Sequence, residues 1–265
     1  MPKTSPVSAK PQINSGTLAN HLGRDFEKEV ELQLVKSGLR SMPSSLVERI
    51  DANDGAGLLA AAYAAEGLFE QQSTFRGVVY PQMRVPSVFS NIGLEDIEGR
   101  RDFVIVIENG RIRDGVAEPL TIHLEVKCQE SVGSADEKAE RTLLNVLAGR
   151  AAYGLIIWSG AGAVPQLYPY MHRACVHQEG WRTALQYMAH KKFEEPQGPT
   201  QLFFSDTLEG CLAQLAAITE AEAAGQILSY ERWFDAQPKD SVLVLSENQG
   251  RRKKRCAKTL DLFGS

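Results

Sequence analysis

Hydrophobic and polar positions along the chain change their period from one segment to the next. In the first periodic segment, apolar residues recur on one helical stripe with charged residues between them: Phe26, Val30, Leu34 and Val35. Gly38 stands where a helix C-cap is expected. The Ala-rich apolar stretch 46–69 predicts one or two further helices. Residues 1–17 are rich in Pro, Ser and Lys without such a period, and predict a disordered leader.

Two β-branched runs give the clearest strand signal. The run 102–108 ends at the turn dipeptide Asn109-Gly110, and the second run covers 120–127. A loop containing Gly115 and Pro119 joins them. The pattern therefore predicts two adjacent strands in a hairpin-like pair.

The remaining segments alternate between helical and extended patterns. Residues 75–89 predict short extended segments broken by Pro81 and Pro86. The other expected elements follow in chain order: a helix opened by the capping box Ser134–Glu137 and reaching about Arg150, a buried strand at 154–158, helical structure over 168–192, a strand at 201–205 and a helix over 207–218. This order predicts an α/β fold, with a mixed central sheet flanked by helices.

Composition narrows the class of protein. The chain has 265 residues, 43% of them hydrophobic, which is enough for a core in one domain, expected over 18–235. No apolar run approaches the ~20 residues of a membrane span, and the N-terminus lacks an apolar signal region, so a cytoplasmic location is expected. The cysteines lack a Cys-x-x-Cys pair, and His172, Cys175 and His177 have no fourth ligand nearby, so free thiols and ordinary packing are expected.

Charge is unevenly distributed. The formal net charge is -4, yet the segment 248–258 holds six cations and no acid, which leaves about -10 (-4 minus 6) for the rest. We therefore expect a basic C-terminal tail over 236–265. The global charge neither supports nor excludes a nucleic-acid partner, since local fields decide that.

Acidic and basic residues gather at the ends of the two predicted strands. Asp102 opens one strand, and Glu125 and Lys127 lie two positions apart on the same face of its neighbour. Two adjacent carboxylates repel unless a cation lies between them, and a hard divalent ion such as Mg²⁺, with Mn²⁺ as substitute, fits that position. Lys127 beside it could orient or deprotonate water and offset phosphorane charge. This set of groups suits phosphodiester hydrolysis.

Asp102, followed after 22 residues by Glu125-Val126-Lys127, resembles the PD-(D/E)xK nuclease superfamily, especially its type II restriction endonucleases. Arg101 replaces the usual Pro before the acid. The helix around Glu27 resembles the first core helix of that family, with Glu29 as the nearby competitor. The resemblance implies that Asp102, Glu125 and the Val126 carbonyl hold Mg²⁺, that Lys127 activates water and that Glu27 supports the site.

A structural alternative accompanies each assignment. Asp102 could solvate a strand end and pair with Arg100 or Arg101, and Glu27 could belong to a solvated helix face. Segments near 45–95 and 160–200 have no counterpart in the family and are the candidates for base recognition. The candidate DNA-binding side chains are polar or basic: Gln129, Ser131, Ser134, Arg76, Gln82, Arg84 and Arg173.

The last residues, Thr259 to Phe263, are similar to the bacterial sliding-clamp-binding peptide, with Thr259 in place of Gln. Leu260, Leu262 and Phe263 would fill an apolar groove on a clamp, or dock on their own domain.

The expected function is a Mg²⁺-dependent endonuclease of the type II restriction class that binds double-stranded DNA. The alternatives are a structure-specific repair nuclease recruited by a sliding clamp, and a non-catalytic DNA-binding protein of the same fold. A homodimer is left open, because the sequence does not show the oligomeric state.

Overall fold

The central feature of the fold is one mixed β-sheet. The computed structural model describes residues 15–68, 74–85, 98–129, 135–160, 164–188 and 199–237. Within them six strands pair in the order β1-β2-β3-β4-β5-β6. The strands are β1 (Leu39–Ser41), β2 (Gly77–Val85), β3 (Gly99–Arg113), β4 (Val116–Cys128), β5 (Tyr153–Ser159) and β6 (Gln201–Ser205). The β2–β3 and β3–β4 pairs are antiparallel and the other pairs are parallel. The predicted α/β class is therefore confirmed.

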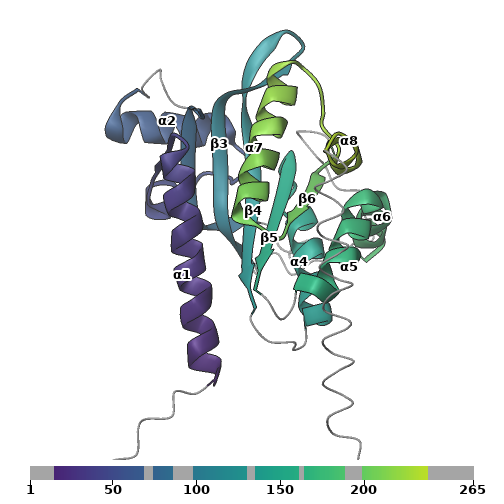
Figure 1. The fold of residues 1–265 in the computed structure, drawn as a ribbon. Helices are drawn as coiled ribbons and strands as arrows, with labels where there is room; N and C mark the ends of the chain where they lie inside the picture. Colours follow the sequence, from purple (N-terminus) through teal and green to yellow (C-terminus); the bar gives the residue numbers. More distant parts are fainter. Residues whose placement is uncertain are drawn as a thin grey trace, which may run out of the picture.

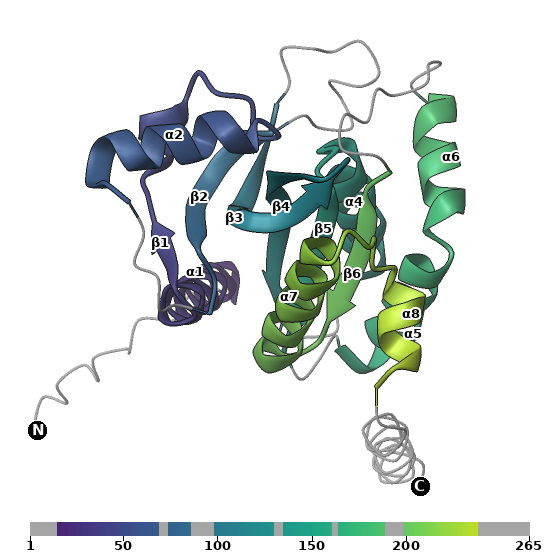
Figure 2. The ribbon, with the colours of Figure 1, turned by 90° about the horizontal axis from the view of Figure 1, so that it is seen from above.

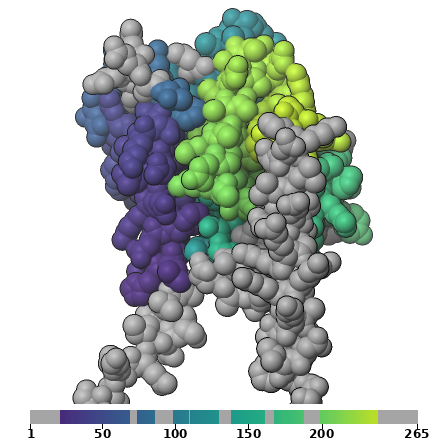
Figure 3. Space-filling model, viewed as in Figure 1, coloured from purple at the N-terminus to yellow at the C-terminus, as the bar shows by residue number. Residues whose placement is uncertain are grey.

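Helices cover both faces of this sheet, as Figures 1 and 2 show. The helices are α1 (Ser15–Lys36), the 3-10 turn η1 (Ser44–Val47), α2 (Gly55–Glu66), α4 (Ala135–Ala148), α5 (Val164–Val176), α6 (Gln178–Met188), α7 (Leu208–Ala223) and α8 (Tyr230–Asp235). Helices α1 and α7 lie over one face, which the space-filling view in Figure 3 shows, and α2 and α4 lie over the other. No helix in the described ranges is both long and apolar enough to cross a membrane.

The β3–β4 hairpin is longer than the sequence predicts. The expected turn at Asn109-Gly110 is wrong, because β3 continues through these residues to a turn at Asp114-Gly115, both of which have positive φ (52° and 79°). The pairing shifts between Ile107 and Arg111, so a bulge absorbs the dipeptide. Pro119, expected in a loop, lies in β4 opposite this bulge, where a missing N–H disturbs the ladder least.

Strand β2 corrects the expectation that Pro81 breaks the segment 75–89, whereas Pro86 lies outside the described residues. Pro81 lies inside β2, paired with Phe103 of β3. On its other side β1 pairs only as far as Val79, so the missing N–H of Pro81 leaves no partner strand unsatisfied there. Because β2 lies between β1 and β3, this part of the segment 45–95 belongs to the central sheet.

The N-terminal helix also starts earlier than predicted. Helix α1 begins at Ser15, inside the expected leader 1–17, because helical structure extends beyond the apolar stripe. It ends before Gly38, whose φ of 106° favours glycine and whose N–H donates to the Val35 carbonyl. Helix α4 begins at Ala135, within the predicted Ser134–Glu137 capping box, whose side chains lie outside those that the structure describes.

The C-terminal half contains the predicted elements in the predicted order, followed by the short helix α8, which the sequence pattern does not predict. Strands β5 and β6 occur at the two expected apolar runs, and α7 starts after Thr207, whose hydroxyl accepts from the N–H of Gly210. The predicted helical stretch 168–192 contains two helices, α5 and α6, up to its last described residue. The central side chains of β3, β4 and β5 are almost fully buried, including Ile105, Leu124 and Ile156, so the middle of these three strands is tightly packed.

Candidate active site

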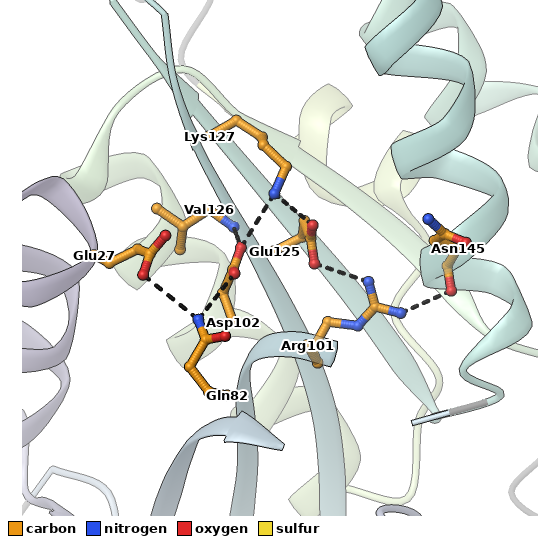
Figure 4. A network of polar contacts seen from close by, with 8 residues as sticks. All are labelled: Glu27, Gln82, Arg101, Asp102, Glu125, Val126, Lys127 and Asn145. Carbon is orange, nitrogen blue, oxygen red and sulfur yellow. Dashed lines mark hydrogen bonds and ion pairs between the residues drawn. The ribbon is translucent and has the colours of Figure 1, made fainter. Parts of the chain in front are cut away.

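The predicted acids meet where β3 begins and β4 ends. Phe103 pairs with Leu124 in the antiparallel ladder. Asp102 and Glu125 therefore lie on neighbouring strands, one position further towards this end of the ladder. The Lys127 ammonium lies between the two carboxylates: Nζ donates to Oδ2 of Asp102 at 3.3 Å and to Oε1 of Glu125 at 2.5 Å. Figure 4 shows the three side chains converging. The structure therefore brings together residues that are up to 25 positions apart in the chain.

Asp102 is fixed by two further contacts. Its Oδ2 accepts from the backbone N–H of Val126 at 2.7 Å, and its Oδ1 accepts from Nε2 of Gln82 at 3.3 Å. Only 12% of its side chain is exposed, compared with 32% for Lys127. Groups from strands β2 and β4 thus hold the Asp102 carboxylate in place. Lys127 is more exposed to solvent than Asp102.

Glu125 has a second cationic partner that the sequence analysis did not identify. The NH1 group of Arg101 donates to Oε2 of Glu125 at 2.9 Å, and NH2 donates to the backbone carbonyl of Asn145 in α4 at 2.7 Å. The Arg101 side chain is only 2% exposed. The sequence analysis considered a pairing of Arg101 with Asp102, but the structure pairs Arg101 with Glu125.

Glu27 reaches the same cluster from α1. Its Oε2 accepts from Nε2 of Gln82 at 3.5 Å, so one amide group connects Glu27 and Asp102. Gln82 has a φ of 54°, a left-handed conformation that a non-glycine residue adopts at a cost. Glu27 is half-buried whereas its competitor Glu29 is exposed. The structure therefore places Glu27, and not Glu29, beside the acids.

Burial and mutual repulsion act on two of the acids in the same direction. Burial, followed by the negative charge of Glu125, raises the pKa of Asp102 above its ordinary value. Burial, followed by the charge of Asp102, raises the pKa of Glu27. Both acids therefore hold negative charge at an energetic cost, which a bound cation would relieve.

The remaining pair is stabilised in its ionised form. Burial alone would raise the pKa of Glu125, but the Lys127 and Arg101 charges outweigh burial and lower it. Burial alone would lower the pKa of Lys127, but Glu125 and Asp102 outweigh it and raise it. At neutral pH the cluster thus holds a carboxylate and an ammonium in contact, and Lys127 carries a proton.

The donor set fits a hard divalent cation. Asp102 and Glu125 offer carboxylate oxygens that already converge on one positive group, the Lys127 ammonium. Among the described residues, no three His, Cys, Asp or Glu side chains are grouped to hold a metal ion. Two carboxylates suffice for Mg²⁺, which usually keeps several waters and takes further oxygens from a bound phosphate.

The predicted DNA-binding residues are scattered. Arg84 is exposed, and its NH1 lies 3.6 Å from Glu98, whereas Arg76 pairs with Glu108 at 2.9 Å, nearer the opposite end of β2. Arg173 is exposed on α5, and Gln129 is half-buried, with its backbone N–H donating to the Ser159 carbonyl. The residues that lie outside those with described side chains are Ser131, Ser134, Leu260, Leu262 and Phe263.

Gln82, predicted as a DNA-binding residue, contacts Glu27 and Asp102 through its side-chain amide. Its contact with DNA stays a prediction. No sequence signal marked the contact with the two acids, because that contact depends on the local kink of β2. In the segment considered for zinc, His172 packs against Tyr168, Tyr230 and Phe234.

Comparisons with known proteins give no relative for this chain: no family model, curated protein or solved structure matches it. Its function is therefore inferred from the geometry and chemistry of the site.

Proposed function

We propose that the protein is a Mg²⁺-dependent endonuclease that hydrolyses phosphodiester bonds in double-stranded DNA. The observation that carries the proposal is the contact of Lys127 with both Asp102 and Glu125 at the end of adjacent strands. Two acids and a lysine in this arrangement fit the resemblance to the PD-(D/E)xK nucleases. By that resemblance, the sequence-specific cleavage of a type II restriction enzyme is the first expectation.

In the proposed site, the two acids at the strand ends are the metal ligands. Asp102 and Glu125 would hold Mg²⁺, with the Val126 carbonyl as a further oxygen ligand. When bound, the ion would supply Lewis-acid stabilisation of charge on the phosphate and lower the pKa of a bound water. Asp102 is suited to this task because its position is fixed by Val126 N–H and its negative charge is poorly compensated.

Lys127 acts as a proton donor in hydrogen bonds and as a positive charge, because its pKa is raised. An ammonium cannot remove a proton from water, but it orients the attacking oxygen and stabilises the negative phosphate oxygens of the transition state. Glu27, whose pKa is also raised, is the better acceptor for the proton that the water loses. Water then attacks phosphorus in line, the P–O3′ bond breaks, and the leaving 3′ oxygen takes a proton from solvent water, so that 5′-phosphate and 3′-hydroxyl ends result.

Incubation of the full chain with plasmid DNA and with branched oligonucleotides tests this proposal. Discrete plasmid fragments in Mg²⁺, absent in EDTA and restored by Mn²⁺, are the expected result. Cleavage confined to flaps or junctions would replace restriction by the structure-specific alternative. DNA binding without cleavage of any substrate would show a non-catalytic protein, and full activity in EDTA would contradict metal-dependent chemistry.

A further inference from the structure

The strongest observation outside the acid–acid–lysine set is the buried Arg101. It stands directly before Asp102, and its guanidinium bridges two elements of the fold by donating to Oε2 of Glu125 and to the Asn145 carbonyl. Only 2% of the side chain is exposed. A buried arginine that contacts one oxygen of the acid fixes the orientation of the whole carboxylate.

The contact divides the two oxygens of Glu125 between two cations. Oε2 faces Arg101 at 2.9 Å, and Oε1 faces Lys127 at 2.5 Å. Lys127 is half-buried and has a flexible side chain, whereas Arg101 is anchored to α4 through Asn145. An incoming cation would therefore displace Lys127 from Oε1 and leave Arg101 on Oε2.

We infer that Arg101 is a positioning residue, which holds Glu125 so that only Oε1 faces the metal and whose own charge weakens metal binding. This inference rests on the proposed function. Because only 2% of its side chain is exposed, the arginine acts through Glu125. Arg101 fixes one orientation of the Glu125 carboxylate. Its positive charge close to the bound ion also lowers the affinity of the site for the metal, because like charges repel.

The inference predicts opposite changes in two measurements. In Arg101→Met, cleavage should fall by about 10–100-fold because Glu125 loses its fixed orientation. The affinity for Mn²⁺, measured on the full chain by electron paramagnetic resonance at pH 8, should be retained or rise by about threefold because one repelling charge is gone. A merely structural role would weaken both together.

Two companion variants make the test decisive. Arg101→Lys keeps the charge but lacks the two-armed guanidinium that bridges Glu125 and the Asn145 carbonyl. Its Mn²⁺ affinity should therefore match the wild type, and its cleavage should lie between the wild type and Arg101→Met. Arg232→Met removes an exposed arginine of α8 and should change neither quantity.

Cleavage by Arg101→Met within about threefold of the wild type, well short of the expected loss, would overturn the inference. A parallel loss of Mn²⁺ binding and cleavage in that variant would overturn it too. If circular dichroism shows Arg101→Met to be unfolded, Arg101→Lys decides instead: cleavage equal to that of the wild type, or a parallel loss of Mn²⁺ binding and cleavage, would overturn the inference. A wild type that neither binds Mn²⁺ nor cleaves DNA would instead refute the proposed function itself, together with the inference that rests on it.

Discussion

Two buried clusters of charge lie along the β3–β4 hairpin, and they differ in balance and access. The site cluster consists of Arg101, Asp102, Glu125 and Lys127. The hairpin cluster consists of Arg111, Glu222 and Tyr153. A buried arginine pairs with a glutamate in each, at 2.9 Å in the first and 3.2 Å in the second.

The hairpin cluster is closed. Glu222 accepts from Arg111 on one oxygen and from the Tyr153 hydroxyl on the other, and the Tyr153 oxygen in turn accepts from the Leu228 N–H. Exposure of the two charged side chains is 8% and 4%. Every charge has its partner, so this cluster fastens α7 to the sheet.

The site cluster has a further acid beside it and a half-exposed lysine. Glu27 and Asp102 share one amide donor, and the pKa of each is raised. Burial of charge is therefore common to both clusters and does not distinguish them. The site cluster differs by its excess of carboxylates beside a solvent-accessible cation, and this difference supports the proposal that it is the functional site.

The largest expected effect separates the clusters by activity. Glu125→Gln or Lys127→Met should lower DNA cleavage by about a thousandfold, because each removes charge that stabilises the transition state. Arg111→Met, assayed on folded protein, should cleave within about twofold of the wild type, since its cluster lies outside the reaction. Single-turnover cleavage of a labelled duplex measures all three. Equal losses from both clusters would contradict the distinction.

The reverse experiment separates them by stability. Glu222→Ala should lower the free energy of unfolding by about 3–5 kcal/mol, because it removes the carboxylate that Arg111 contacts in a buried position. Urea unfolding followed by circular dichroism measures this. Glu220→Ala, at an exposed position of the same helix, is the matched control. A loss below about 1 kcal/mol, a value typical of an exposed pair, would show that the hairpin cluster is not a fastening.

A pair of variants tests whether Glu27 takes part in the reaction together with the site cluster. Glu27→Gln should lower cleavage by about tenfold or more if the carboxylate accepts the proton from water. Glu29→Gln changes the same residue type two positions away on the exposed face of α1 and should leave the rate unaltered. Equal rates for the two variants would remove Glu27 from the mechanism.

The smallest expected effect is on the free energy of unfolding, which the buried, ionised carboxylate of Asp102 lowers. Because its pKa in the folded state is raised, Asp102→Asn should stabilise the protein at pH 7. The sign follows from linkage: the cost exists above the folded pKa and disappears below the unfolded pKa of 3.8, where both states are protonated. Thermal unfolding across this range measures the gain. A variant less stable than the wild type at pH 7 would contradict the raised pKa.

The sequence allowed the strand pair and its acids to be predicted because β-branched runs and strand periodicity are local signals. Asp102, Glu125 and Lys127 were identified in this way, and their mutual contacts follow from the register of β3 and β4. The turn predicted at Asn109-Gly110 is wrong for the same reason. Its turn preference is a local signal, whereas in the structure β3 pairs with β4 on both sides of the dipeptide, which lies in a bulge.

The parts that were missed depend on tertiary contacts. Nothing local shows that Arg101 contacts an acid 24 positions later or that its second partner is a carbonyl 44 positions away. Gln82 was selected for its chemistry alone, and its kink beside Asp102 arises only within the sheet. Pro81 appeared to break a strand because the short reach of β1 is not visible from sequence.

The most direct test of the central claim compares the wild type with Asp102→Asn on one supercoiled plasmid in Mg²⁺. Both proteins are purified identically, and DNA binding is first measured in Ca²⁺ to establish that both are folded and bind. The account predicts that the wild type cuts the plasmid, that EDTA stops it, and that Asp102→Asn binds DNA but cuts at least about a hundredfold more slowly. Cleavage by Asp102→Asn at the rate of the wild type, or no cleavage by the wild type, would contradict it.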